Sequence, residues 1–125
     1  MFPISFGYKS KLKDYVSTDA YTGKEVAREN RTVEHILPHC NGGKNIESNY
    51  LMVDKDINNL RGNIPFDKWL KAYPEFIKNI QNYLNKLRGI KINNKDYVKE
   101  VIPTLNKEAK GLITFKGNKK IDINI

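Results

Sequence analysis

The chain has 125 residues, of which 39% are hydrophobic and 29% are charged. This balance is typical of a single folded domain over residues 1–125 and excludes a disordered segment. The single Cys excludes an internal disulfide framework and a zinc site made of four cysteines. No stretch is apolar enough for a signal peptide or a membrane span, so we expect a cytoplasmic protein that binds no membrane.

The net charge of +8 is unevenly distributed along the chain. Residues 1–66 contain nine Lys and Arg against eight Asp and Glu, whereas residues 67–125 contain thirteen against six. A basic half favours a polyanionic partner such as nucleic acid, but a lysine-rich surface also increases solubility. Charge alone leaves both interpretations open.

Hydrophobic spacing and turn residues predict a mixture of helices and strands in chain order. The first half should contain a short helix within 7–17, a turn at Thr22-Gly23, strands over 31–38 and 50–53 joined by a loop, and a helix over 54–62 with Asp54 as N-cap. The second half should contain helices over 65–73 and 74–89 and an amphipathic helix within 93–111 that is broken or kinked at Pro103. A terminal hairpin is expected around Gly117-Asn118. The predicted fold class is therefore α+β.

The stretch "VEHILPHCNGG" at residues 33–43 contains both histidines and the only Cys of the chain. Cys40 follows His35 and His39 closely, but no helix start is expected there to lower its pKa, so we interpret it as a lone loop Cys. The spacing of the two histidines suits a helix, whereas Pro38 lies between them. A structural zinc site at this stretch is therefore not expected.

Residues 34–61 contain the groups that hydrolysis of a phosphodiester needs. A neutral imidazole such as His35 can deprotonate water, and carboxylate or amide oxygens, here from Glu34 and Asn58, are the ligands that Mg²⁺ prefers. Arg61 follows one helical turn later as a phosphate ligand. Neighbouring residues of a regular strand point to opposite faces, so Glu34 and His35 share a site only if the strand twists at its end.

The segment "VEHILPHCNGGKNIESNYLMVDKDINNLRGN" resembles the HNH endonuclease family, which carries a ββα-metal motif. The resemblance rests on Glu34-His35, Gly42-Gly43, Asn49-Tyr50, Asn58 and Arg61-Gly62, which match the family in order and spacing. The upstream "YTGKEV" is similar to the lead-in of HNH domains in phage proteins and CRISPR RNA-guided nucleases. The likeness covers residues 21–63, about a third of the chain, and leaves 64–125 as a helical, basic part outside it.

The resemblance implies a role for each matched residue. His35 would be the general base that activates water, and Glu34 with Asn58, favoured over the adjacent Asn59, would hold one Mg²⁺ or Mn²⁺ that stabilises the 3′ leaving oxygen. Asn49 would hold the loop by hydrogen bonds and orient the His35 strand, and Arg61 would contact phosphate. The expected products carry 5′-phosphate and 3′-hydroxyl ends. Lys44 and His39 are further candidates for contact with the nucleic acid.

The sequence departs from the family pattern at two points. The acid before the histidine is more often Asp than Glu34, and Asp19, Asp54 and Ile57 stand where many members have zinc-binding Cys, so we expect no structural zinc. The expected enzyme is a metal-dependent endonuclease of phage or mobile-element type that cleaves double-stranded DNA in the cytoplasm, with a homodimer as one option. The alternatives are an inactive DNA-binding HNH-fold protein, a nuclease toxin with an immunity partner, and an RNase.

Overall fold

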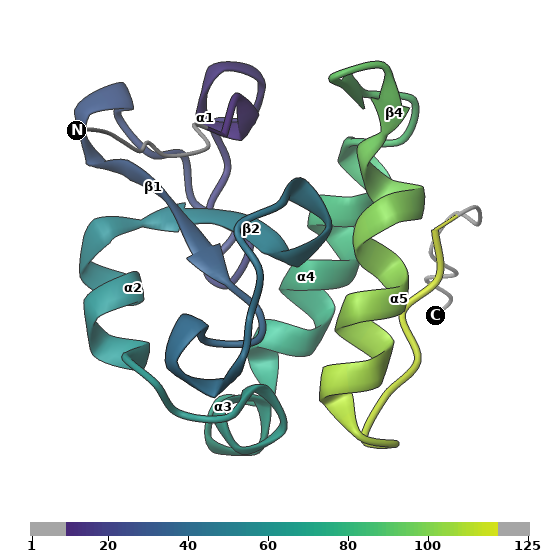
Figure 1. Cartoon of the computed structure of the whole chain (residues 1–125). Helices are drawn as coiled ribbons and strands as arrows, with labels where there is room; N and C mark the ends of the chain where they lie inside the picture. Colours follow the sequence, from purple (N-terminus) through teal and green to yellow (C-terminus); the bar gives the residue numbers. More distant parts are fainter. Residues whose placement is uncertain (1–9, 118–125) are drawn as a thin grey trace, which may run out of the picture.

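The computed structural model describes residues 10–117 as a mixed α and β fold, in agreement with the predicted α+β class (Figure 1). The elements in chain order are α1 (Leu12–Tyr15), the 3₁₀ turn η1 (Arg28–Asn30), β1 (Arg31–His35), the 3₁₀ turns η2 (His39–Asn41) and η3 (Glu47–Asn49), β2 (Tyr50–Asp54), α2 (Lys55–Arg61), α3 (Phe66–Ala72), α4 (Glu75–Lys86), β3 (Lys91–Ile92), β4 (Lys95–Asp96) and α5 (Tyr97–Ala109). Within this part of the chain, no helix combines the length and apolar character needed to cross a membrane.

Strands β1 and β2 form an antiparallel pair that leads directly into α2. Arg31 pairs with Asp54 at one end of the pair, and His35 pairs with Tyr50 at the other. As the sequence predicted, Asp54 is the N-cap of α2, because its side chain accepts a hydrogen bond from the backbone N–H of Asp56. The helix stops at Gly62, which has φ of 55°, a backbone conformation that glycine adopts without strain.

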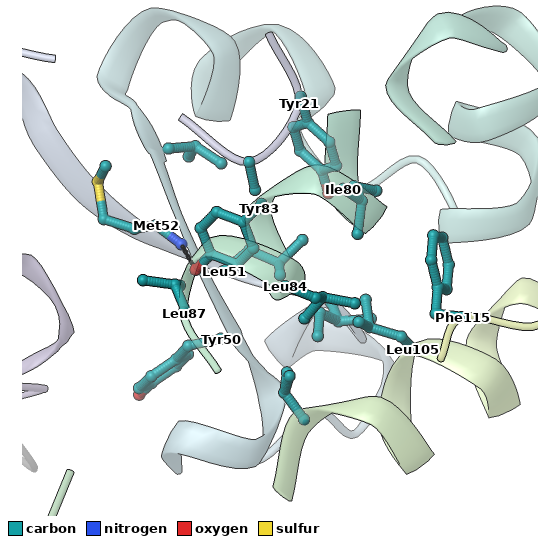
Figure 2. Packing of buried hydrophobic residues seen from close by; sticks show 14 of the residues in the cluster. Tyr21, Tyr50, Leu51, Met52, Ile80, Tyr83, Leu84, Leu87, Leu105 and Phe115 are labelled. Carbon is teal, nitrogen blue, oxygen red and sulfur yellow. Dashed lines mark hydrogen bonds between the residues drawn. The ribbon is translucent and has the colours of Figure 1, made fainter. Parts of the chain in front are cut away.

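The hydrophobic core packs against β2, which is buried along most of its length. Side chains of α4 lie over this strand, and the hydroxyl of Tyr83 accepts a hydrogen bond of 3.0 Å from the backbone N–H of Met52 (Figure 2). On the N-terminal side, the backbone N–H of Ala20 donates to the carbonyl of Met52 at 2.9 Å. Both backbone groups of Met52 that face away from β1 are thus satisfied, so the outer edge of the strand pair is covered at this position.

Helices α3, α4 and α5 follow the β1-β2-α2 unit in the chain and supply most of the remaining core. Pro65 and Pro74 precede α3 and α4, close to the first helical positions that the sequence predicted for them. Trp69 and Phe76 are buried and their rings lie 5.4 Å apart, which agrees with a core role for these aromatic side chains and leaves no face of Trp69 open for base stacking. The sequence predicted a break or a kink at Pro103; the break is wrong, because α5 runs through Pro103 as one helix.

A short hairpin precedes α5 that the sequence interpretation missed. Strands β3 and β4 pair across Asn93 and Asn94, which have φ of 54° and 65°. Positive φ at both central residues is the geometry of a tight hairpin turn, and Asn tolerates it better than most residues. The predicted C-terminal hairpin extends over residues 118–125, which lie outside the described residues, and residues 112–117 form no strand.

The carboxylate of Asp19 joins the N-terminal turn to the end of the strand pair. One oxygen accepts from the backbone N–H groups of Tyr21 (2.7 Å) and Thr22 (2.9 Å), and the other accepts from the backbone N–H of Asp54 at 2.7 Å. Asp19 is 1% exposed. By the family resemblance this is a position of a zinc-binding Cys, and here hydrogen bonds connect the same two segments.

Replacement of Asp19 by Ala should therefore lower the free energy of unfolding by about 2 kcal/mol, since it leaves buried N–H groups without acceptors. Denaturant unfolding of the purified variant measures the change. Asp14→Ala is the matched control, because Asp14 pairs with Arg28 at the surface and such pairs contribute about 0–1 kcal/mol. Equal losses in the two variants would contradict the role assigned to Asp19.

Candidate active site

The loop between β1 and β2 is held in place by the side chain of Asn49. Its carbonyl oxygen accepts from the backbone N–H of Leu37 at 2.9 Å, and its amide nitrogen donates to the carbonyls of Leu37 (3.0 Å) and Lys44 (3.1 Å). Gly43 lies against the carbonyl group of Leu37, because a Cβ added at Gly43 would come within 1.7 Å of that oxygen. The chain therefore closes tightly on itself here, and Asn49 is positioned to fix the loop in the way the resemblance implies.

His35 is the last residue of β1 and its ring is half-buried beneath the loop. Its Nε2 lies 2.7 Å from Oδ1 of Asn45, and its ring meets the ring of Tyr50 edge to face at 5.1 Å between centroids. The ring of His39 lies 6.0 Å away. Among residues 10–117, Nδ1 of His35 makes no hydrogen bond, so one ring nitrogen is held and the other is available.

Glu34 points to the opposite side of β1, into the interior. It is 2% exposed, and its Oε2 accepts hydrogen bonds from the hydroxyl of Tyr21 and from Nη1 of Arg61, the latter at 3.1 Å. Its Oε1 is buried and has no hydrogen-bond partner among residues 10–117. Burial raises the pKa of this carboxyl to about 7, although Arg61 and Tyr21 act in the opposite direction. The strand thus keeps its regular alternation, and Glu34 and His35 do not face one site.

Arg61 is also buried, which corrects the expectation that it contacts phosphate. It is 1% exposed, and besides Glu34 its guanidinium donates to the backbone carbonyls of His35 (2.6 Å), Ile36 (2.8 Å) and Ile64 (2.9 Å). The guanidinium also lies over the ring of Phe66, 5.8 Å from its centroid. All of these partners lie inside the protein. Arg61 therefore connects the end of α2 to the backbone of β1 at His35, the candidate general base.

In this arrangement Glu34, one of the two predicted ligands, offers no free and accessible oxygen to a divalent cation. One carboxylate oxygen of Glu34 is occupied by Arg61 and Tyr21, and the other is sealed from solvent. Asn58 is half-buried on α2. Within residues 10–117, no three His, Cys, Asp or Glu side chains come together as metal ligands. A cation ligated by Glu34 would require the carboxylate to leave Arg61.

The remaining predicted site residues lie on the exposed side of the loop. His39 and Cys40 are exposed on η2, and Lys44 is exposed after Gly43. Lys44 borders a groove between the loop and α5, and Lys107 of α5 lies on the other side of this groove. These two lysines put positive charge next to the loop that carries the partner of His35, which suits contact with phosphates.

Two residues of this site were not singled out from the sequence. Tyr21 was placed only within the lead-in, although it donates to Glu34 from the buried turn. Asn45 was missed entirely, because nothing in a loop sequence indicates which side chain will reach a strand ten residues away. For Glu34 a signal was available: it precedes Ile36 by two residues, so strand alternation already puts it on the same, buried face.

Comparisons with known proteins give no assignment: no family model, no curated protein and no solved structure matches this chain.

Proposed function

We propose that this protein is an HNH-type endonuclease that hydrolyses phosphodiester bonds of DNA, with His35 as the general base that activates water. The observation that carries the proposal is the state of His35 at the end of a β1-β2-α2 unit. Nε2 is held by Asn45 and Nδ1 has no partner among residues 10–117, which is the arrangement a base needs.

The surroundings of His35 support the same proposal. Its backbone carbonyl is fixed by Arg61, its ring contacts Tyr50, and the loop above it is closed by Asn49. Groups held in this way lose little freedom when a substrate binds, which is how an active site positions a base. The resemblance adds a requirement for Mg²⁺ or Mn²⁺, whose expected ligand Glu34 is here buried in an ion pair with Arg61.

A second candidate function is DNA binding without cleavage. The specific observation in its favour is the burial of Glu34, the residue expected to ligate the cation. A basic second half of the chain and the exposed Lys44 and Lys107 would still bind the phosphate backbone. The two candidates predict different results with the same DNA.

The test is cleavage of supercoiled plasmid by the wild-type protein with Mg²⁺, with Mn²⁺ or with EDTA. We expect nicking that requires the divalent ion, and we expect His35→Ala to lower the rate by about 100-fold or more, as removal of a general base does. Asn58→Ala tests the second residue that the resemblance assigns to the ion. Matched single-stranded RNA and DNA substrates in the same assay distinguish a DNase from an RNase.

Asn41→Ala is the matched control, because Asn41 is exposed on the same loop and its side chain is described only against Cys40. It should change the rate by far less than His35→Ala does. Equal losses in both variants would contradict the role of His35. Retardation of the DNA without cleavage under every metal condition would favour the binding protein, and cleavage of RNA alone would refute DNA as the substrate.

A further inference from the structure

The hydrogen bond between His35 and Asn45 determines which nitrogen of the imidazole carries a proton. Oδ1 of Asn45 has no hydrogen to donate, so across the 2.7 Å contact it is Nε2 of His35 that donates. In the neutral ring the second nitrogen, Nδ1, then carries the lone pair. The contact therefore selects one of the two tautomers and leaves Nδ1 as the nitrogen that can accept a proton.

The backbone next to Asn45 is held by the loop. Its chain neighbour Lys44 has its carbonyl bonded to the amide of Asn49, and Asn49 also bonds to both backbone groups of Leu37. The close approach of Gly43 to Leu37 fixes the other side of the same turn. Thus the loop that leaves β1 returns and delivers an acceptor oxygen to the ring at the strand's end.

The ring is also fixed from the side of the strand. The backbone carbonyl of His35 accepts from Arg61 at 2.6 Å, and Tyr50, its partner across the sheet, contacts the ring edge to face. The titratable groups with described contacts to His35 are Arg61, Tyr50 and His39, whose ring lies 6.0 Å away between centroids. Backbone, ring face and Nε2 are all held, so Asn45 completes the orientation of the ring.

We infer that Asn45 is a positioning residue that makes Nδ1 of His35 the proton acceptor for the attacking water, an inference that rests on the proposed nuclease function. The water's proton moves to Nδ1 and the resulting hydroxide bonds to phosphorus as the ester oxygen leaves. The imidazolium keeps its Nε2–H on Oδ1 of Asn45, which stabilises the charged ring. Asn45 does not contact the reacting atoms and acts only through His35.

The test combines long-range ¹H–¹⁵N NMR of His35 with rates of plasmid cleavage for the wild type, Asn45→Ala and Asn41→Ala. Asn41 is exposed in the same loop and its side chain is described only against Cys40, so Asn41→Ala is the matched control. In the wild type we expect the neutral ring to carry its proton on Nε2. In Asn45→Ala we expect the tautomer with its proton on Nδ1 to appear as well, because the acceptor that holds Nε2–H is gone.

The kinetic expectation follows from the same contact. In Asn45→Ala kcat should fall by about 10-fold with little change in KM, whereas Asn41→Ala should leave both close to the wild-type values. Circular dichroism and the chemical shifts of distant residues show that the exposed substitutions leave the fold intact.

Two failures can be told apart. If the neutral ring of His35 has the same tautomer in Asn45→Ala as in the wild type, the positioning role is overturned, whatever the activity. If His35 responds as expected but neither the wild type nor any variant cleaves nucleic acid, the proposed function is overturned, and the base role for Nδ1 with it, while the contact between the two side chains stands.

Discussion

Replacement of Arg61 by Met should lower the free energy of unfolding at pH 8 by about 3–5 kcal/mol, the cost of breaking a buried ion pair from one side. Met keeps an apolar stem of similar length, so the change removes the guanidinium and little packing. The carbonyls of His35, Ile36 and Ile64 lose their donor, and the Glu34 carboxylate loses its cation at 2% exposure. Denaturant unfolding at pH 8 measures the loss.

Arg28→Met is the control for this substitution. Arg28 forms an ion pair with Asp14 in which the two side chains are 68% and 51% exposed, and such a pair contributes at most about 1 kcal/mol. The double variant Arg61→Met with Glu34→Leu should recover part of the loss, since it leaves no unpaired buried charge. A loss below about 1 kcal/mol in Arg61→Met would show that the buried cluster does not stabilise the fold.

The cluster formed by Arg61, Glu34 and the backbone carbonyls that Arg61 contacts also connects the stability of the fold to the candidate site. Arg61 donates a hydrogen bond to the backbone carbonyl of His35, and the buried carboxylate of Glu34 forms an ion pair with the same guanidinium. The same contacts that hold α2 on β1 therefore fix the backbone of the proposed base. We expect substitutions in this cluster to affect cleavage through the orientation of His35, even though neither charged side chain faces solvent.

The strands and helices that position the site could be predicted because local signals and tertiary contacts agree there. "RTVEH" and "YLMVD" are rich in β-branched and apolar residues and form β1 and β2, and Asp54 caps α2 as its side-chain type suggests. The register of β1 and β2 was not accessible, since the loop between them sets it through Asn49. Propensity alone does not describe such long-range contacts.

The predictions that failed concern groups whose environment depends on the whole fold. Arg61 was expected to contact phosphate, but here one buried carboxylate and the backbone carbonyls around it satisfy its donors. Pro103 was expected to break or kink a helix, yet α5 is not broken there and packs against the core at Val101 and Leu105. At Pro103 tertiary packing outweighs a local preference.

Replacement of Glu34 by Gln should remove most of the pH dependence of stability between pH 5 and pH 8. Burial raises the pKa of Glu34 in the folded protein to about 7 from an ordinary value of 4.5. In this pH range the unfolded chain is ionised at Glu34 while the folded protein still holds the proton. The folded state therefore binds more protons, and its stability falls as pH rises from about 4.5 to about 7.

The size of the effect follows from the shift, at about 1.4 kcal/mol for each pKa unit. Between pH 5 and pH 8 the wild type should lose about 2–3 kcal/mol relative to Glu34→Gln, which stays neutral like the protonated carboxyl. Glu25 acts with the opposite sign, because hydrogen bonds from Ser17 and Thr18 lower its pKa, but it is present in both proteins and cancels in the difference.

Urea unfolding of both proteins at half-unit pH steps measures this difference directly. At pH 5 the two should have nearly equal stability, and at pH 8 the Gln variant should be the more stable protein. A wild type that becomes more stable than Glu34→Gln as pH rises would mean that the pairing with Arg61 outweighs burial and that the carboxylate is ionised in the fold. In that case an anionic Glu34 would lie one residue from the proposed base, and cleavage should not depend on protonation of this carboxyl.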